Sequence, residues 1–198
     1  SATAKINNLV LQKEASGERI MNLAVGEPNF TTPNNIKLAG QKAIQMGLTS
    51  YTPTDGLSKL KQAIIDKVLR ENSLIYDKKQ IIICSGGKQV IFNALMATLN
   101  AQDEVVITSP YWVSYPDIVN LCGGKPVIIK TNIANNFKVT VKELKQKFNS
   151  KTKWFIINSP SNPSGTVYSK TELFAISKVL KLFPNINIIS DDIYEHII

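Results

Sequence analysis

The feature that most constrains the fold of this chain is a repeated alternation between short β-branched runs and longer segments with helical periodicity. Strands are expected at residues 20–25, 81–84, 104–108, 126–130, 154–157 and 186–190. Two helix starts are marked by capping boxes, Thr140 with Glu143 and Ser169 with Glu172. Strands of this length that alternate with helices predict βαβ units, and therefore an α/β fold whose mostly parallel sheet is covered by helices.

Composition excludes several classes of protein. The 198 residues are 43% hydrophobic and 19% charged, which is enough apolar material for a core. No run approaches ~18 uncharged apolar residues, and the first residues are polar. We therefore expect neither a transmembrane helix nor a secretory signal, and a cytoplasmic protein.

Cysteine, histidine and arginine are scarce. Cys84 and Cys122 form no CxxC pair, and His196 is the single histidine, so we predict no disulfide framework and no metal site. The net charge of +8 raises nucleic acid as a partner, but only Arg19 and Arg70 are arginines, and the lysines are spread along the chain. We interpret the charge as a solvated surface and expect no nucleic-acid partner.

Four polar loops follow predicted strands, at residues 85–88, 109–114, 158–165 and 191–194. Ligands of open α/β sheets bind beyond the carboxyl ends of the strands, so these loops predict the ligand site. Gly86 and Gly87 before a helix indicate a phosphate cup, although neither a Walker loop nor GxGxxG is present and a plain turn is the alternative. Trp112 is either a stacking platform or a core residue.

Two further loop residues suggest chemistry. Asn162 lies between Pro160 and Pro163, which fix the loop, although an ordinary turn also fits. Asp191 follows the apolar run 186–189, where an acid needs a partner such as a cationic ring nitrogen or a metal, or serves as a helix N-cap.

Taken together in this order and spacing, the loops resemble those of the fold-type I pyridoxal-phosphate (PLP) aminotransferases of class I. The greatest similarity is to the bacterial aspartate aminotransferase subgroup, which includes prephenate aminotransferases. The matching stretches run from one end of the chain to the other and lie at residues 1–3, 25–28, 51–56, 86–89, 110–116, 158–165 and 191–194. The resemblance implies a PLP-dependent transferase-like fold, here a partial three-layer αβα large domain over residues 34–198, preceded by an N-terminal segment over residues 1–33 that belongs to the small domain and substrate entrance.

The resemblance also implies roles for individual residues. Gly86, Gly87 and Lys88 hold the cofactor phosphate, Trp112 stacks on the pyridine ring, and Asp191 pairs with the ring nitrogen.

Further implied roles concern the ring oxygen and the substrate. Asn162 and Tyr194 bind the phenolic oxygen of the ring, Tyr51 reaches the phosphate of a neighbouring subunit in a homodimer, and Gly26 offers its backbone to the substrate α-carboxylate. Trp112 and Asn162 also contact the substrate, while Ser1, Thr3 and Lys88 recognise its distal carboxylate.

The implied activity is PLP-dependent transamination between an amino acid, aspartate or glutamate, and a 2-oxo acid. The lysine that forms the Schiff base in this family has no counterpart here, so we expect the chain to be the N-terminal half of an enzyme and inactive alone. The alternatives are a prephenate or aromatic aminotransferase, and a non-catalytic module that binds phosphate or a cofactor.

Overall fold

The computed structural model describes residues 2–23, 26 and 30–197, without the side chains of residues 2–4. The chain divides into two compact units, Ser1–Thr52 and Pro53–Ile198, and each is described by itself. The domain boundary expected after residue 33 stays a prediction.

The described part of the first unit holds the helices α1 (Ala2–Ala15) and α2 (Asn34–Gln45). The strand predicted at 20–25 is wrong for residues 20–23, which have no regular secondary structure, and residues 24–25 lie outside the described residues. The apolar run is real, but a strand also needs a neighbouring backbone to pair with, and the described part of this unit holds no strand.

The second unit is built on a parallel sheet of four strands in the order β2-β1-β3-β4. The strands are β1 (Glu104–Ser109), β2 (Lys125–Lys130), β3 (Thr152–Asn158) and β4 (Asn187–Asp191). Four of the predicted strands are therefore confirmed to within one or two residues at each end. The segment 81–84 is not a strand: Ile82 is 67% exposed, and the N–H of Ile83 donates to the carbonyl of Asp55 in a turn.

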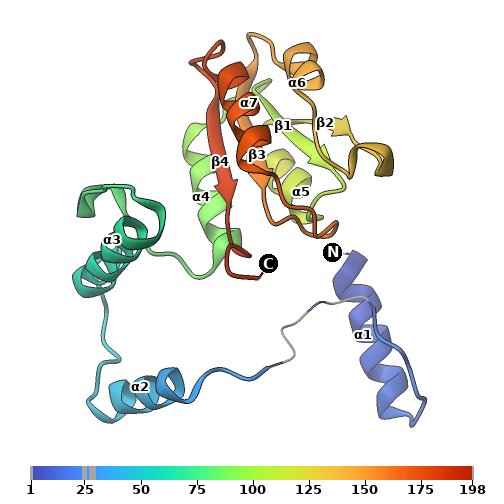
Figure 1. Cartoon of the computed structure of the whole chain (residues 1–198). Helices are drawn as coiled ribbons and strands as arrows, with labels where there is room; N and C mark the ends of the chain where they lie inside the picture. Colours follow the sequence, from blue (N-terminus) through green and yellow to red (C-terminus); the bar gives the residue numbers. More distant parts are fainter. Residues whose placement is uncertain (1, 24–25, 27–29, 198) are drawn as a thin grey trace. The chain divides into compact units, whose positions relative to one another are not determined.

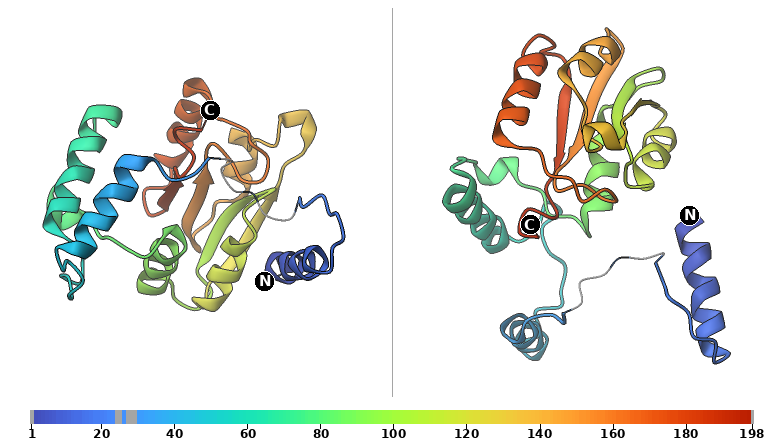
Figure 2. Two further views of the ribbon diagram at one scale, coloured as in Figure 1. Left: turned by 90° about the horizontal axis from the view of Figure 1, so that it is seen from below. Right: turned by 45° about the vertical axis from the view of Figure 1, so that its right-hand side comes forward.

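Helices cover both faces of this sheet (Figures 1 and 2). One face carries α4 (Gly87–Thr98) and α5 (Ser114–Leu121), and the other carries α6 (Val141–Lys147) and α7 (Lys170–Leu180). The remaining helical segments are α3 (Ser58–Asn72), η1 (Lys78–Gln80) and η2 (Ile133–Asn135). The predicted α/β class with a helix-covered parallel sheet is confirmed.

The core follows the two-residue period of the strands. In β1, Val105 and Ile107 pack in the cluster under α4 and α5, whereas Val106 packs in the cluster under α6 and α7. In β3, Phe155 is buried in the second cluster and its neighbour Ile156 in the first. Both faces of each central strand are thus buried, which is why these strands read as continuous apolar runs.

Both capping boxes exist. The Thr140 hydroxyl accepts from the N–H of Glu143, and the Ser169 hydroxyl accepts from the N–H of Glu172. In turn, the carboxylate of each glutamate accepts from the backbone N–H of its cap residue, so α6 and α7 begin where the sequence predicts. Among the described residues, no helix is long and apolar enough to cross a membrane.

The Ser169–Glu172 box leads to a pH-dependent prediction. The backbone N–H of Ser169, together with Lys138 at 2.9 Å, lowers the pKa of Glu172 from 4.5 to about 2. A lowered pKa contributes stability above about pH 4.5, and this stability is lost as the pH falls toward about 2. The Glu172 side chain is 42% exposed, so solvent screening limits its contribution to about 1 kcal/mol.

We expect Glu172→Gln to lower the free energy of unfolding by about 1 kcal/mol at pH 7, and the difference from wild type to close at acidic pH. Denaturant unfolding at several pH values measures this. Asn132→Ala removes an uncharged cap, the side chain that accepts from the N–H of Ala134, so its cost should stay nearly constant over the same range. A Glu172→Gln cost that is also constant contradicts the electrostatic interpretation.

Candidate functional site

The carboxyl ends of the strands border a cavity of about 480 Å³ within the second unit. It is lined by residues of all four predicted loops. These residues are Gly86, Gly87, Lys88, Trp112, Tyr115, Asn158, Asn162, Asp191, Ile193 and Tyr194. The structure therefore brings together the predicted site residues of this unit: three of the loops follow β1, β3 and β4, whose carboxyl ends share one edge, and the loop at 85–88 joins them at the start of α4.

The register of β3 and β4 sets one wall of the cavity. Asn158 and Asp191 are partners at the ends of these strands, and the Asn158 amide donates to the Asp191 carbonyl at 2.7 Å. The Asn158 side-chain oxygen accepts from the N–H of Asn162 at 2.8 Å, and the Asn162 amide donates to the Tyr194 hydroxyl at 3.3 Å. This chain of bonds fixes Asn162 and Tyr194 relative to the sheet.

The Asp191 carboxylate has two hydrogen-bond donors. The Tyr115 hydroxyl donates to Oδ2 at 2.6 Å, and the N–H of Ile193 donates to Oδ1 at 3.4 Å. Burial, and after it the hydrogen bond to Asp191, raises the pKa of Tyr115 well above its ordinary value. Tyr115 is therefore a neutral donor at physiological pH, and among the residues that the structure describes Asp191 forms no ion pair with a positively charged side chain.

A helix start and an indole ring complete the lining. Gly86 adopts φ 85° as the N-cap of α4, a conformation that favours glycine, and Gly87 is the first helical residue. The first backbone N–H groups of α4 lack partners within the helix and suit an anion. The Lys88 ammonium lies 5.1 Å from the ring centroid of Trp112, a cation–π distance.

Four predicted site residues are not placed at this cavity. Gly26 and Tyr51 belong to the first unit. Ser1 and the side chain of Thr3 lie outside the described residues. Their assigned roles stay predictions, as do the roles of the residues that line the cavity.

Tyr115, Asn158 and Ile193 also line the cavity, although the sequence did not indicate them as site residues. Asn158 and Ile193 lie within loops that were predicted to matter. Tyr115 lies on α5 whereas Trp112 belongs to the loop before it, so the available signal was only that Tyr115 falls within the matching stretch 110–116.

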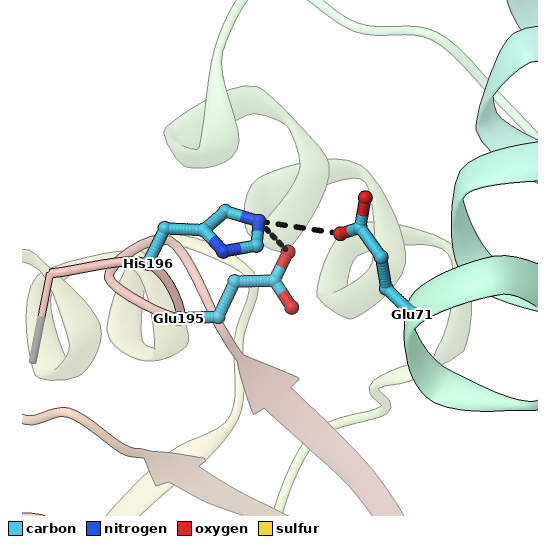
Figure 3. A group of neighbouring side chains, drawn as sticks. All are labelled: Glu71, Glu195 and His196. Atoms are coloured by element: carbon cyan, nitrogen blue, oxygen red, sulfur yellow. Dashed lines mark ion pairs between the residues drawn. The ribbon is translucent and has the colours of Figure 1, made fainter.

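His196 has neighbours that the sequence did not indicate. Figure 3 shows it beside Glu71 and Glu195, with Nε2 3.3 Å and 3.5 Å from their carboxylate oxygens. Lys67 forms ion pairs with both glutamates, at 3.3 Å to Glu71. The Lys67 ammonium already supplies the positive charge that a metal ion would bring, so the group is an ion-pair cluster that joins α3 to the segment after β4.

Comparison with known proteins relates this fold to one family. The family described as aminotransferase class I and II matches residues 18–198. A probable aspartate/prephenate aminotransferase from Rickettsia felis is 50% identical over 197 residues, which is 100% of this chain and 48% of the relative.

Solved structures agree with this relationship. The aspartate aminotransferase of Rhizobium meliloti matches with a TM-score of 0.93 and 42% identity, over 98% of this chain and 49% of the other. The aspartate aminotransferase from Thermus thermophilus with maleate matches with a TM-score of 0.91 and 36% identity, over 96% of this chain and 50% of the other. The chain thus spans about half the length of the relatives that it matches.

Proposed function

Because the chain belongs to the class I and II aminotransferase family, we propose that it takes part in PLP-dependent transamination between an amino acid and a 2-oxo acid. The observation that carries this proposal is the Asp191 carboxylate, which lines the cavity together with Trp112 and the N-terminus of α4. An anion, a planar aromatic surface and a phosphate-binding helix start are the three features that a phosphorylated pyridine ring needs.

The lining residues fit the cofactor. The Gly86 and Gly87 backbone lies open to the cavity, and a Cβ at either glycine would meet no atom within 4 Å, so the loop leaves room for a phosphate. Tyr115 and Ile193 occupy part of Asp191's hydrogen-bonding capacity but bring no positive charge. The carboxylate is therefore available for a cationic ring nitrogen.

When bound, PLP supplies an electron sink for the carbanion that forms at the substrate Cα. Asp191 keeps the ring nitrogen protonated, which deepens that sink. Trp112 holds the ring from one face, and Asn162 and Tyr194 donate to its phenolic oxygen. The amides of Gly86, Gly87 and Lys88 bind the phosphate and so fix the ring relative to the sheet.

We propose a dicarboxylic amino acid, aspartate or glutamate, as the substrate. Lys88 lines the cavity, and its ammonium is exposed and rests on the Trp112 ring rather than in an ion pair with a carboxylate among the described residues. The Thermus thermophilus relative was solved with maleate, a dicarboxylate. Ser1 and Thr3 complete this subsite, and the Gly26 backbone binds the α-carboxylate.

Prephenate is a second candidate substrate. The Rickettsia felis relative is named for aspartate and prephenate together. Prephenate also carries a distal carboxylate, so a lysine at this position serves both compounds.

We further propose a cytoplasmic homodimer in which Tyr51 reaches the cofactor phosphate of the partner subunit. Tyr51 is fully exposed in this chain, as a residue that acts on a second copy requires.

Asp191→Asn tests the central role. It keeps the shape of the side chain and removes its charge, so we expect a rate of aspartate transamination at least about a hundredfold lower, with the melting temperature little changed. The rate is measured on protein expressed from its complete reading frame and saturated with PLP.

Asp192→Asn is the matched control for this experiment. Asp192 is the exposed neighbour, bonded to the Ser190 hydroxyl at 2.7 Å and absent from the cavity lining, so its variant should transaminate at the wild-type rate. A near-normal rate for Asp191→Asn would refute the assigned role.

Lys88→Ala tests the substrate class. A charge-assisted hydrogen bond to the distal carboxylate is worth about one to two powers of ten in kcat/KM. We expect that loss for aspartate and glutamate and little loss for alanine and phenylalanine. An equal loss for all four amino acids means that Lys88 serves the phosphate or the fold instead.

A further inference from the structure

Tyr115 contacts two of the residues that the proposed function depends on. Its hydroxyl donates to Asp191 Oδ2 at 2.6 Å. Its ring meets the Trp112 ring edge to face, with centroids 5.3 Å apart and planes at 85°. One side chain therefore connects the anion of the cavity with its aromatic wall.

Tyr115 is itself held firmly. It is 3% exposed and belongs to the core cluster under α4 and α5, together with Ile118 and Val119 of its own helix. Its backbone N–H donates to the carbonyl of Trp112 at 3.0 Å, where the loop after β1 turns into α5. Because both its backbone and its ring are fixed, Tyr115 can hold the side chains that it contacts in one orientation.

The kind of donor matters for the charge of the site. A lysine or arginine in this place would pair with Asp191 and neutralise it, whereas a neutral phenol stabilises the carboxylate by a hydrogen bond and leaves its charge available. The raised pKa of Tyr115 supports a donor that stays protonated. The bond also restricts rotation of the carboxylate, so Oδ1 keeps a constant orientation.

We propose that Tyr115 is a positioning residue that orients the Asp191 carboxylate toward the ring nitrogen of bound PLP and sets the tilt of the Trp112 ring. The proposal rests on the function proposed above. Loss of the Tyr115 hydroxyl should weaken cofactor binding, an effect that is measured separately from turnover.

The test compares two ligands. PLP has the ring nitrogen, whereas 1-deaza-pyridoxal 5′-phosphate has carbon in its place and cannot pair with Asp191. Cofactor-free protein, expressed from its complete reading frame, is titrated with each compound in a calorimeter. Tyr115→Phe keeps the aromatic ring and removes the hydroxyl, so we expect about tenfold weaker binding of PLP and less than about twofold weaker binding of the deaza compound.

Tyr168→Phe is the matched control. Tyr168 is also buried, at 8% exposed, and its hydroxyl accepts from the N–H of Val139 in the core cluster on the opposite face of the sheet. Tyr168→Phe removes a buried hydroxyl that lies outside the cavity. The ratio of its affinity for PLP to its affinity for the deaza compound should therefore match that of wild type.

The outcomes separate the two proposals. Equal weakening of both compounds by Tyr115→Phe, or no weakening of either, overturns the positioning role. Failure of the wild-type protein to bind PLP overturns the proposed function instead. If melting curves show that Tyr115→Phe does not fold, the same two titrations are carried out with Tyr115→His, which keeps a ring and an N–H donor. If Tyr115→His prefers PLP over the deaza compound by the same ratio of affinities as wild type, the positioning role is supported. If that preference is lost, the role is overturned.

Discussion

The parallel pairing of β1, β3 and β4 underlies the whole candidate site, because it brings their carboxyl ends to one edge of the sheet. The register then places Asn158 beside Asp191, and hydrogen bonds extend this order to Asn162 and Tyr194. Burial of β1 and β3 on both faces fixes how these two strands pack, whereas β4 is largely exposed and its register rests on its backbone pairing with β3. The backbone at Asp191 is thus held by its pairing with β3 and by the Asn158 amide, and neither of these interactions depends on the charge of the side chain.

Much of this arrangement could be predicted from local sequence. Glycine and serine or threonine caps have short-range physical causes, so the starts of α6 and α7 were predictable from Thr140 and Ser169. The apolar runs of β1 and β3 likewise indicated buried strands. The loops after β1, β3 and β4 gather at one edge because these strands are parallel, whereas the loop at 85–88 follows a segment that is not a strand and reaches the same place at the start of α4.

The failures have a common physical reason, which is that they depend on partners distant in sequence. The run at 81–84 has strand composition but no neighbouring strand, and it pairs with a turn instead. Tyr115 reads as an ordinary core tyrosine on an amphipathic helix, and only the fold brings Asp191 to its hydroxyl. In the same way, His196 meets Glu71 only because α3 lies beside the segment that follows β4.

The central claim is that Asp191 provides an uncompensated negative charge for a protonated ring nitrogen. The most direct measurement is the ¹⁵N chemical shift of PLP labelled at its ring nitrogen and bound to the protein near neutral pH. The account predicts the shift of a protonated pyridinium in wild type and a move toward the neutral form in Asp191→Asn. A neutral pyridine signal in the wild-type protein would contradict it.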